Sequence, residues 1–237
     1  MEESVQLRDG IESLYETFAS YPLRDDTNAC SCCHSTSDEQ RVHTKSLRKL
    51  SQDDLRQYAA DALFVWGDAN DFRHFLPRIF ELLVTHGDEF EDPQVVFGKL
   101  YHAEWRTWPG PEQQSIERFL KAVWDCVLNA EPHEYCEREI EDWLCGFARA
   151  GSHVPPYLAT WLATDTVNAQ LNLAAFLADS GFLKPNCDAS DYWGDRRESF
   201  AEVVAWVRSD AVKAKMTRIA AEFPQYDFVE RAYISLP

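Results

Sequence analysis

Residues 116–128 read IERFLKAVWDCVL. Apolar side chains recur in this segment every three or four residues, which is the spacing that brings side chains onto one face of an α-helix. The pattern predicts an amphipathic helix that ends before the Glu131-Pro132 pair, because proline rarely continues a helix. The stripe consists of Ile116, Phe119, Leu120, Val123, Trp124, Val127 and Leu128.

Helical spacing continues on both sides of this segment. A capping-box pattern that begins at Ser51 precedes the apolar stripe of residues 55–66, and Gly67 is expected to close that helix. The next stripe covers residues 72–83, where Pro77 is expected to kink or split the helix. Further stripes occupy residues 93–101, 140–147, 158–161, 167–177, 200–207 and 212–223.

The chain as a whole is predicted to be all-α. The alternation of apolar and polar residues that is typical of strands appears nowhere convincingly, and short loops separate the helical stripes. We expect about nine to eleven helices in a compact array, with a short α-solenoid of antiparallel helix pairs as the alternative. Residues 1–237 are expected to form a single domain, with most of the eight Trp residues in its core.

The charge of the chain restricts the kind of partner that it can bind. Its formal net charge of −17 repels nucleic acid and anionic membranes, and it attracts a basic protein. The alternative is that the acidic surface only keeps the protein soluble. We therefore expect a basic protein partner and neither nucleic acid nor membrane, while the sequence does not indicate an oligomeric state.

The compartment is expected to be the cytoplasm. Met1 is followed by charged residues, and no run approaches the roughly 20 apolar residues that span a bilayer. The seven Cys residues are odd in number and four of them are scattered, which is not the pattern of a secreted disulfide framework.

A polar Cys/His loop at residues 26–50 is the strongest candidate for a metal site. It concentrates Cys30, Cys32 and Cys33, with His43 further along, and thiolates with an imidazole are the ligands of a closed structural zinc site. The spacing is irregular, and the adjacent side chains of Cys32 and Cys33 are expected to diverge, so His34 or a distant histidine could replace one of them. The alternative is a loop of free or redox-active thiols.

The cysteine cluster and the segment DFRHFLPR at residues 71–78 together carry a resemblance. With the Trp66-Gly67-Asp68 sequence between them, they resemble an uncharacterised bacterial family over residues 20–85. The resemblance implies a bacterial cytosolic protein in which the cysteine cluster and the DFRHFLPR segment belong together. It implies no particular activity.

Four polar residues form a second candidate site before the break that is expected at Pro77. Asp68, Asp71, Arg73 and His74 lie close together in the sequence, at a position where helix ends expose polar groups. His74 could act as a general base, complete the zinc site, or form a structural hydrogen bond at a helix junction. The structural interpretation is favoured.

An acidic segment at residues 131–142 is the candidate partner-binding surface. Glu134, Tyr135, Glu137 and Glu141 combine carboxylates with an aromatic ring, a mixture that suits a basic groove on a partner. The alternative is a solvated helix N-terminus, where acidic residues offset the helix dipole.

The sequence favours a binding protein over an enzyme. It contains no Gly-rich phosphate loop, no H-E-x-x-H and no G-x-S-x-G motif. We expect an acidic protein-binding protein, such as an immunity protein or antitoxin that neutralises a basic bacterial effector. The alternatives are a helical scaffold or adaptor with a structural zinc ion, and an enzyme with a site around His74.

Overall fold

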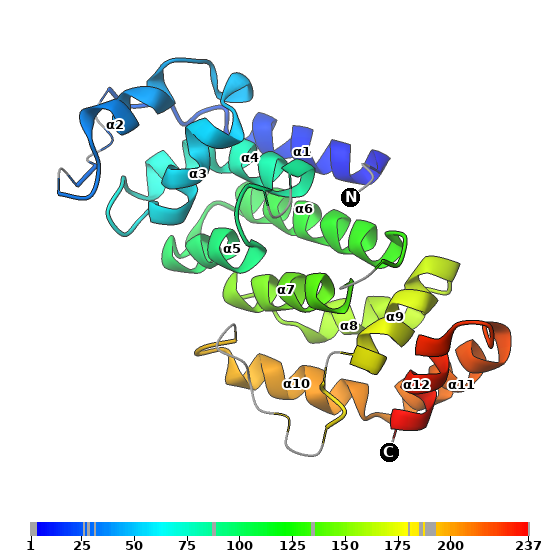
Figure 1. Cartoon of the computed structure of the whole chain (residues 1–237). Helices are drawn as coiled ribbons and strands as arrows, with labels where there is room; N and C mark the ends of the chain where they lie inside the picture. The colour runs from blue at the N-terminus through cyan, green and yellow to red at the C-terminus, as the bar shows by residue number, and fades with distance from the viewer. Residues whose placement is uncertain are drawn as a thin grey trace. The chain divides into compact units, whose positions relative to one another are not determined.

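A computed structural model describes residues 4–25, 27, 29–30, 32–86, 89–133, 136–179, 181–184, 187 and 193–236, without the side chains of residues 36, 136, 137 and 179 (Figure 1). These residues contain twelve α-helices and no β-strand beyond one isolated bridge between Ala62 and Trp66. The prediction of an all-α protein is therefore confirmed, with one helix more than the upper end of the expected range.

The chain divides into two compact units, Met1–Val123 and Trp124–Pro237. The expectation of a single domain stays a prediction. The helices that begin in unit 1 are α1 (Val5–Phe18), α2 (Thr36–His43), α3 (Gln52–Asp61), α4 (Ala69–His86), α5 (Pro93–His102) and α6 (Gly110–Asn129). Unit 2 contains α7 (Cys136–Arg149), α8 (Pro155–Ala163), α9 (Val167–Asp179), α10 (Arg197–Val207), α11 (Asp210–Glu222) and α12 (Asp227–Ser235).

Large aromatic side chains fill the interior of each unit. In unit 1 the ring of Phe80 lies 5.3 Å from that of Phe97 and 5.1 Å from that of Phe119, measured between centroids. In unit 2 the rings of Trp124 and Trp161 meet edge to face at 5.6 Å, and the Trp161 indole N–H donates to the Ala169 carbonyl at 3.0 Å. Every Trp except the half-buried Trp206 is buried, which confirms that the tryptophans mainly form the core.

Three local predictions were wrong. Helix α4 continues through Pro77 without a break, and its buried residues on both sides of the proline supply packing that offsets the lost hydrogen bond. Helix α3 ends at Asp61, so Gly67 lies in the following turn and does not close the helix. The polar loop at residues 26–50 contains α2 and a short 3-10 helix, Leu47–Lys49.

Two further observations concern the helices as a set. Helix α11 was predicted and helix α12 was not. The buried residues of α12 are Val229 and Ala232, and so small a set gives only a weak apolar stripe in the sequence. Among the described residues, no helix has both the length and the apolar character that crossing a membrane requires.

Candidate functional site

The three clustered cysteines lie in the segment that leads into α2. The main-chain N–H of Cys30 donates to the Val65 carbonyl at 2.8 Å, and the Cys30 carbonyl accepts hydrogen bonds from the N–H groups of Cys33 and His34 at 2.9 Å each. The chain therefore makes a tight turn here and enters α2 at its N-cap, Ser35, which forms a reciprocal capping box. The turn and the cap fix the backbone on both sides of the thiols.

This turn gathers the three thiols on one side of the chain. The Sγ atoms of Cys30 and Cys32 lie 2.6 Å apart, those of Cys32 and Cys33 lie 3.6 Å apart, and all three are within 4.8 Å of one another. The expectation that Cys32 and Cys33 diverge was therefore wrong, because the turn brings adjacent side chains together. The three sulfurs are close enough to hold a metal ion. Cys30 is half-buried and the other two cysteines are exposed, so an ion could reach the site from solvent.

The thiols alter one another's proton affinity. Hydrogen bonds from the Cys32 side chain and main chain stabilise the thiolate of Cys30 and lower its pKa. Side-chain hydrogen bonds with Cys30 and Cys33, together with the negative charge of these sulfurs, raise the pKa of Cys32 to about 11. Three thiolates so close together repel one another, and a bound cation would remove that repulsion as it displaces the protons.

Neither nearby histidine joins the cysteines. In the described part of the chain, the group that could hold a metal ion consists of the three cysteines alone. His43, the predicted fourth ligand, is the last residue of α2, and its Nε2 is buried without a hydrogen-bond partner among the described residues. The ring of His34 packs against Trp66 at 4.5 Å, and its Nε2 lies 3.4 Å from Asp61 Oδ2. The geometry therefore provides a site with three protein ligands.

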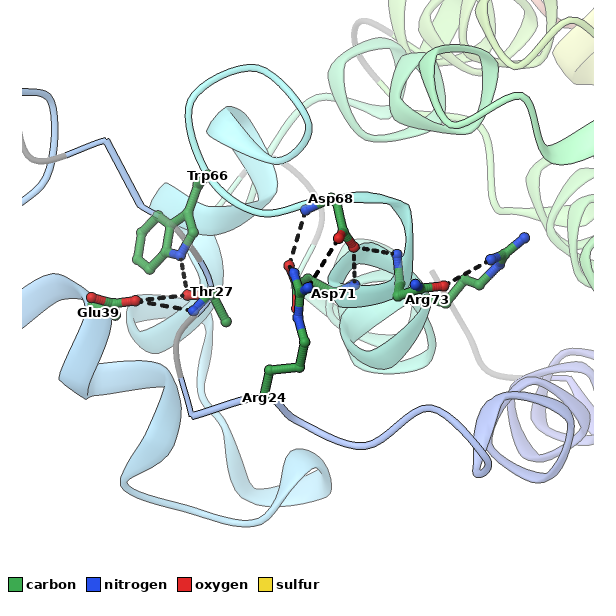
Figure 2. Close-up of polar contacts among 8 residues, drawn as sticks. Arg24, Thr27, Glu39, Trp66, Asp68, Asp71 and Arg73 are labelled. Carbon is green, nitrogen blue, oxygen red and sulfur yellow. Dashed lines mark hydrogen bonds and ion pairs between the residues drawn. The ribbon is translucent and has the colours of Figure 1, made fainter.

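The cysteine segment is also held at Thr27, three residues before Cys30. The Trp66 indole N–H donates to Thr27 Oγ1 at 2.8 Å, while the hydroxyl and main-chain N–H of Thr27 donate to Glu39 Oε1 at 3.1 and 3.2 Å (Figure 2). Thr27 and Trp66 are both buried. These contacts tie the segment to α2 on one side and to the turn after α3 on the other.

A second polar cluster surrounds the first turn of α4 (Figure 2). The buried carboxylate of Asp71 accepts hydrogen bonds from Arg24, with an Nε-to-Oδ1 distance of 2.7 Å, and from the main-chain N–H of Asp68 at 2.9 Å. Arg24 Nη1 lies 3.0 Å from Asp68 Oδ2. Asp68 in turn caps α4 by accepting hydrogen bonds from the N–H groups of Asn70 and Asp71 at 2.7 and 3.3 Å. These bonds close on one another and serve the local fold.

Gly67 allows the chain to pass close to this cluster. Its φ of +75° lies in the left-handed region, which side chains other than hydrogen disfavour. A Cβ at this position would lie 2.9 Å from Asp71 Oδ2, which is closer than real Cβ atoms approach. The glycine is therefore required by the conformation and by the close contact together.

Arg73 and His74, the other two predicted residues of this cluster, also have partners. Arg73 Nε lies 3.3 Å from Glu112 Oε2, and the guanidinium lies over the Trp108 ring at 4.1 Å from its centroid. His74 Nδ1–H donates to the Tyr21 carbonyl at 2.8 Å. Burial lowers the pKa of His74 and keeps the imidazole neutral. This arrangement favours a structural role at the helix junction over a general base or a zinc ligand.

The acidic segment at residues 131–142 is described only in part. Glu134 and Tyr135 lie outside the described residues, and only the main chain of Glu137 is described, within α7. Glu141 Oε1 accepts a hydrogen bond from the indole N–H of buried Trp193 at 3.0 Å, and burial raises the pKa of Glu141. This carboxylate therefore has a partner inside unit 2.

Sequence reasoning did not identify the residues that hold the cysteine segment in place. Val65 acts through its main-chain carbonyl, so its side chain gives no signal in the sequence. Thr27 is one hydroxyl among many polar loop residues, and its importance follows only from burial against Trp66.

No protein-family model matches this chain, and comparisons with curated proteins and with solved structures find no significant match. The functional assignment therefore depends on the chemistry of the site itself.

Proposed function

We propose that this chain is a zinc-binding protein that holds the ion with Cys30, Cys32 and Cys33. The observation that supports the proposal is the convergence of three thiol sulfurs within 4.8 Å of one another at the surface of unit 1. Thiolates are preferred ligands of zinc, which is bound with four ligands in tetrahedral geometry. The fourth position would be taken by water or by a group from a partner molecule.

The role of zinc here differs from that of a zinc finger. Metal ligands that are far apart in the sequence close long loops and stabilise a fold strongly, whereas three ligands within residues 30–33 close only a short one. Zinc at this site would fix the local turn before α2 and leave a coordination position accessible. Reduced thiols are required, which agrees with the expected cytoplasmic location.

Elemental analysis of the purified, untagged protein tests the proposal. We expect about one zinc ion per chain, and none above background in the triple variant Cys30→Ser/Cys32→Ser/Cys33→Ser. Cys187→Ser provides the matched control, because this half-buried cysteine lies outside the cluster. The variant His43→Ala should retain zinc. If the wild-type protein contains no zinc and a thiol titration finds these cysteines oxidised, the redox-active alternative is supported instead.

A second candidate function is the binding of a basic protein partner, as expected of an immunity protein or antitoxin. The net charge of −17 favours it, and acidic residues outnumber basic residues in both units, so the negative charge is not confined to one of them. Co-expression with a basic protein encoded by a neighbouring gene should yield a complex that weakens as the salt concentration rises. A complex insensitive to salt would argue against recognition by charge.

A further inference from the structure

Unit 1 exposes a connected group of aromatic side chains, Phe64, Tyr101 and His102, which we call the Phe64 surface. Phe64 is 60% exposed and Tyr101 is 49% exposed, which is unusual for rings of this size. The His102 ring centroid lies 4.8 Å from that of Phe64 and 5.8 Å from that of Tyr101. The three rings thus form one patch at the surface, contributed by the turn after α3 and by the end of α5.

The backbone around Phe64 holds the ring outward at an energetic cost. Leu63 has a φ of +70°, and its N–H donates to the Trp66 carbonyl at 3.1 Å within the turn that follows α3. A left-handed conformation is unfavourable for a residue other than glycine. Trp66, at the other end of the turn, is buried and donates a hydrogen bond to Thr27, so packing imposes the conformation of Leu63. Strain of this kind concentrates at binding sites.

Carboxylates lie near the patch, and the lysine beneath it is buried. Lys99 lies beneath Phe64, with Nζ 3.9 Å from the ring centroid, but it is only 2% exposed and donates inward to the Ala60 carbonyl. Asp61 and Glu91 lie close enough to Lys99 to act on its charge, and the exposed Glu104 follows the patch along the chain. Exposed rings bordered by carboxylates suit a cationic ligand, because aromatic faces and negative charges both attract it.

We propose that the Phe64 surface docks an arginine-rich segment of a basic protein. The proposal rests on the binding of a basic partner as the function of this chain. Arginine fits better than lysine, since the planar guanidinium stacks on aromatic rings and is more weakly hydrated than an ammonium group. Charge complementarity selects this occupant over an apolar peptide, because the chain is strongly acidic.

The location of the surface also connects it with the cysteine site. Val65 follows Phe64 directly and accepts the hydrogen bond from the main-chain N–H of Cys30 at 2.8 Å. The ring of His34, next to Cys33, packs on Trp66 at the end of the same turn. An ion held by the cysteines would therefore brace the turn that presents Phe64.

Binding of deca-arginine and deca-lysine peptides to the full chain tests the proposal by isothermal titration calorimetry. We expect the wild-type protein to bind deca-arginine about two- to fivefold more tightly than deca-lysine, which is the advantage that stacking at exposed rings confers. Phe64→Ala should remove this preference. Val5→Ala is the matched control, because Val5 is 63% exposed in the same unit, and it should keep the preference.

The possible outcomes test the Phe64 surface separately from the binding of a basic partner. If the wild-type protein binds both peptides and Phe64→Ala keeps the arginine preference, the Phe64 surface is wrong while recognition of a basic partner stands. If neither peptide binds in low salt, both proposals fail. If ultracentrifugation shows a wild-type dimer that Phe64→Ala dissociates, the surface binds a second copy of the chain, and the proposal is overturned. Thermal unfolding of each variant establishes that it is folded.

Discussion

The cysteine segment and the start of α4 are both rich in residues that can perform chemistry, yet the structure uses them differently. At the start of α4, Asp71 is bonded to Arg24 and Asp68, and His74 to the Tyr21 carbonyl. At the cysteine turn, the main chain is fixed while the thiol groups of Cys32 and Cys33 face solvent. A polar cluster whose side chains form hydrogen bonds with one another therefore stabilises the fold. A cluster that is held in place by its main chain keeps its side chains available to bind a ligand.

Removal of Asp71 tests whether the cluster at the start of α4 stabilises the fold. The variant Asp71→Ala removes the buried carboxylate that Arg24 and the Asp68 N–H share, so that Arg24 keeps only its contact with Asp68 Oδ2. We expect a loss of about 2–4 kcal/mol in the free energy of unfolding. Asp25→Ala is the control, because Asp25 is exposed, and it should change the free energy of unfolding by less than about 0.5 kcal/mol. Urea denaturation measures both.

Zinc content should be unchanged in Asp71→Ala. If this variant loses its metal while it keeps its stability, the cluster at α4 belongs to the metal site, and the distinction between the two regions fails.

The contribution of His74 to stability should depend on pH. Burial lowers the pKa of His74 below its ordinary value of 6.5, so between the two values the unfolded chain binds more protons than the folded one. Stability from this residue is therefore complete above about pH 6.5 and decreases as the pH falls towards the folded pKa. Relative to His74→Gln, which does not titrate, the wild-type protein should lose free energy of unfolding over this range.

The expected loss is smaller than that of Asp71→Ala, because the histidine is only partly buried. A constant difference between the wild-type protein and His74→Gln from pH 5 to pH 8 would contradict the neutral, hydrogen-bonded imidazole.

The smallest effect is expected from removing zinc. Three ligands within residues 30–33 close a short loop, so a chelator should lower the melting temperature of the zinc-loaded protein by less than about 3 °C. Differential scanning calorimetry with and without the chelator measures the change. A decrease above about 10 °C would indicate a further ligand from a distant part of the chain, and the site would then stabilise the fold as a zinc finger does.

Much of the fold could be predicted because its signals are local. The capping box from Ser51 to Asp54 appears where the sequence places it, and the stripe over residues 93–101 forms a helix, Pro93–His102. The turn at Leu63 could not be foreseen, since neither glycine nor proline marks it and the burial of Trp66 against Thr27 imposes it. Long-range packing likewise keeps α4 continuous at Pro77.

The candidate site could be predicted in its ligands and not in its geometry. Cys30, Cys32 and Cys33 stand out by composition, and the structure brings their sulfurs together. The turn that makes this possible depends on the carbonyl of Val65, which is remote in sequence and independent of side-chain identity. His43 was expected in the site because of its sequence position, but α2 places it outside the group.

The close approach at Gly67 has a consequence for sequence variation. Since any β-carbon there would collide with a carboxylate that is itself locked in place, a saturation library should tolerate almost no replacement at this position, whatever property is selected. Cys32, by contrast, should accept many residues under selection for folding and few under selection for metal binding. Scoring one library under both selections would thus show which positions build the protein and which positions use it.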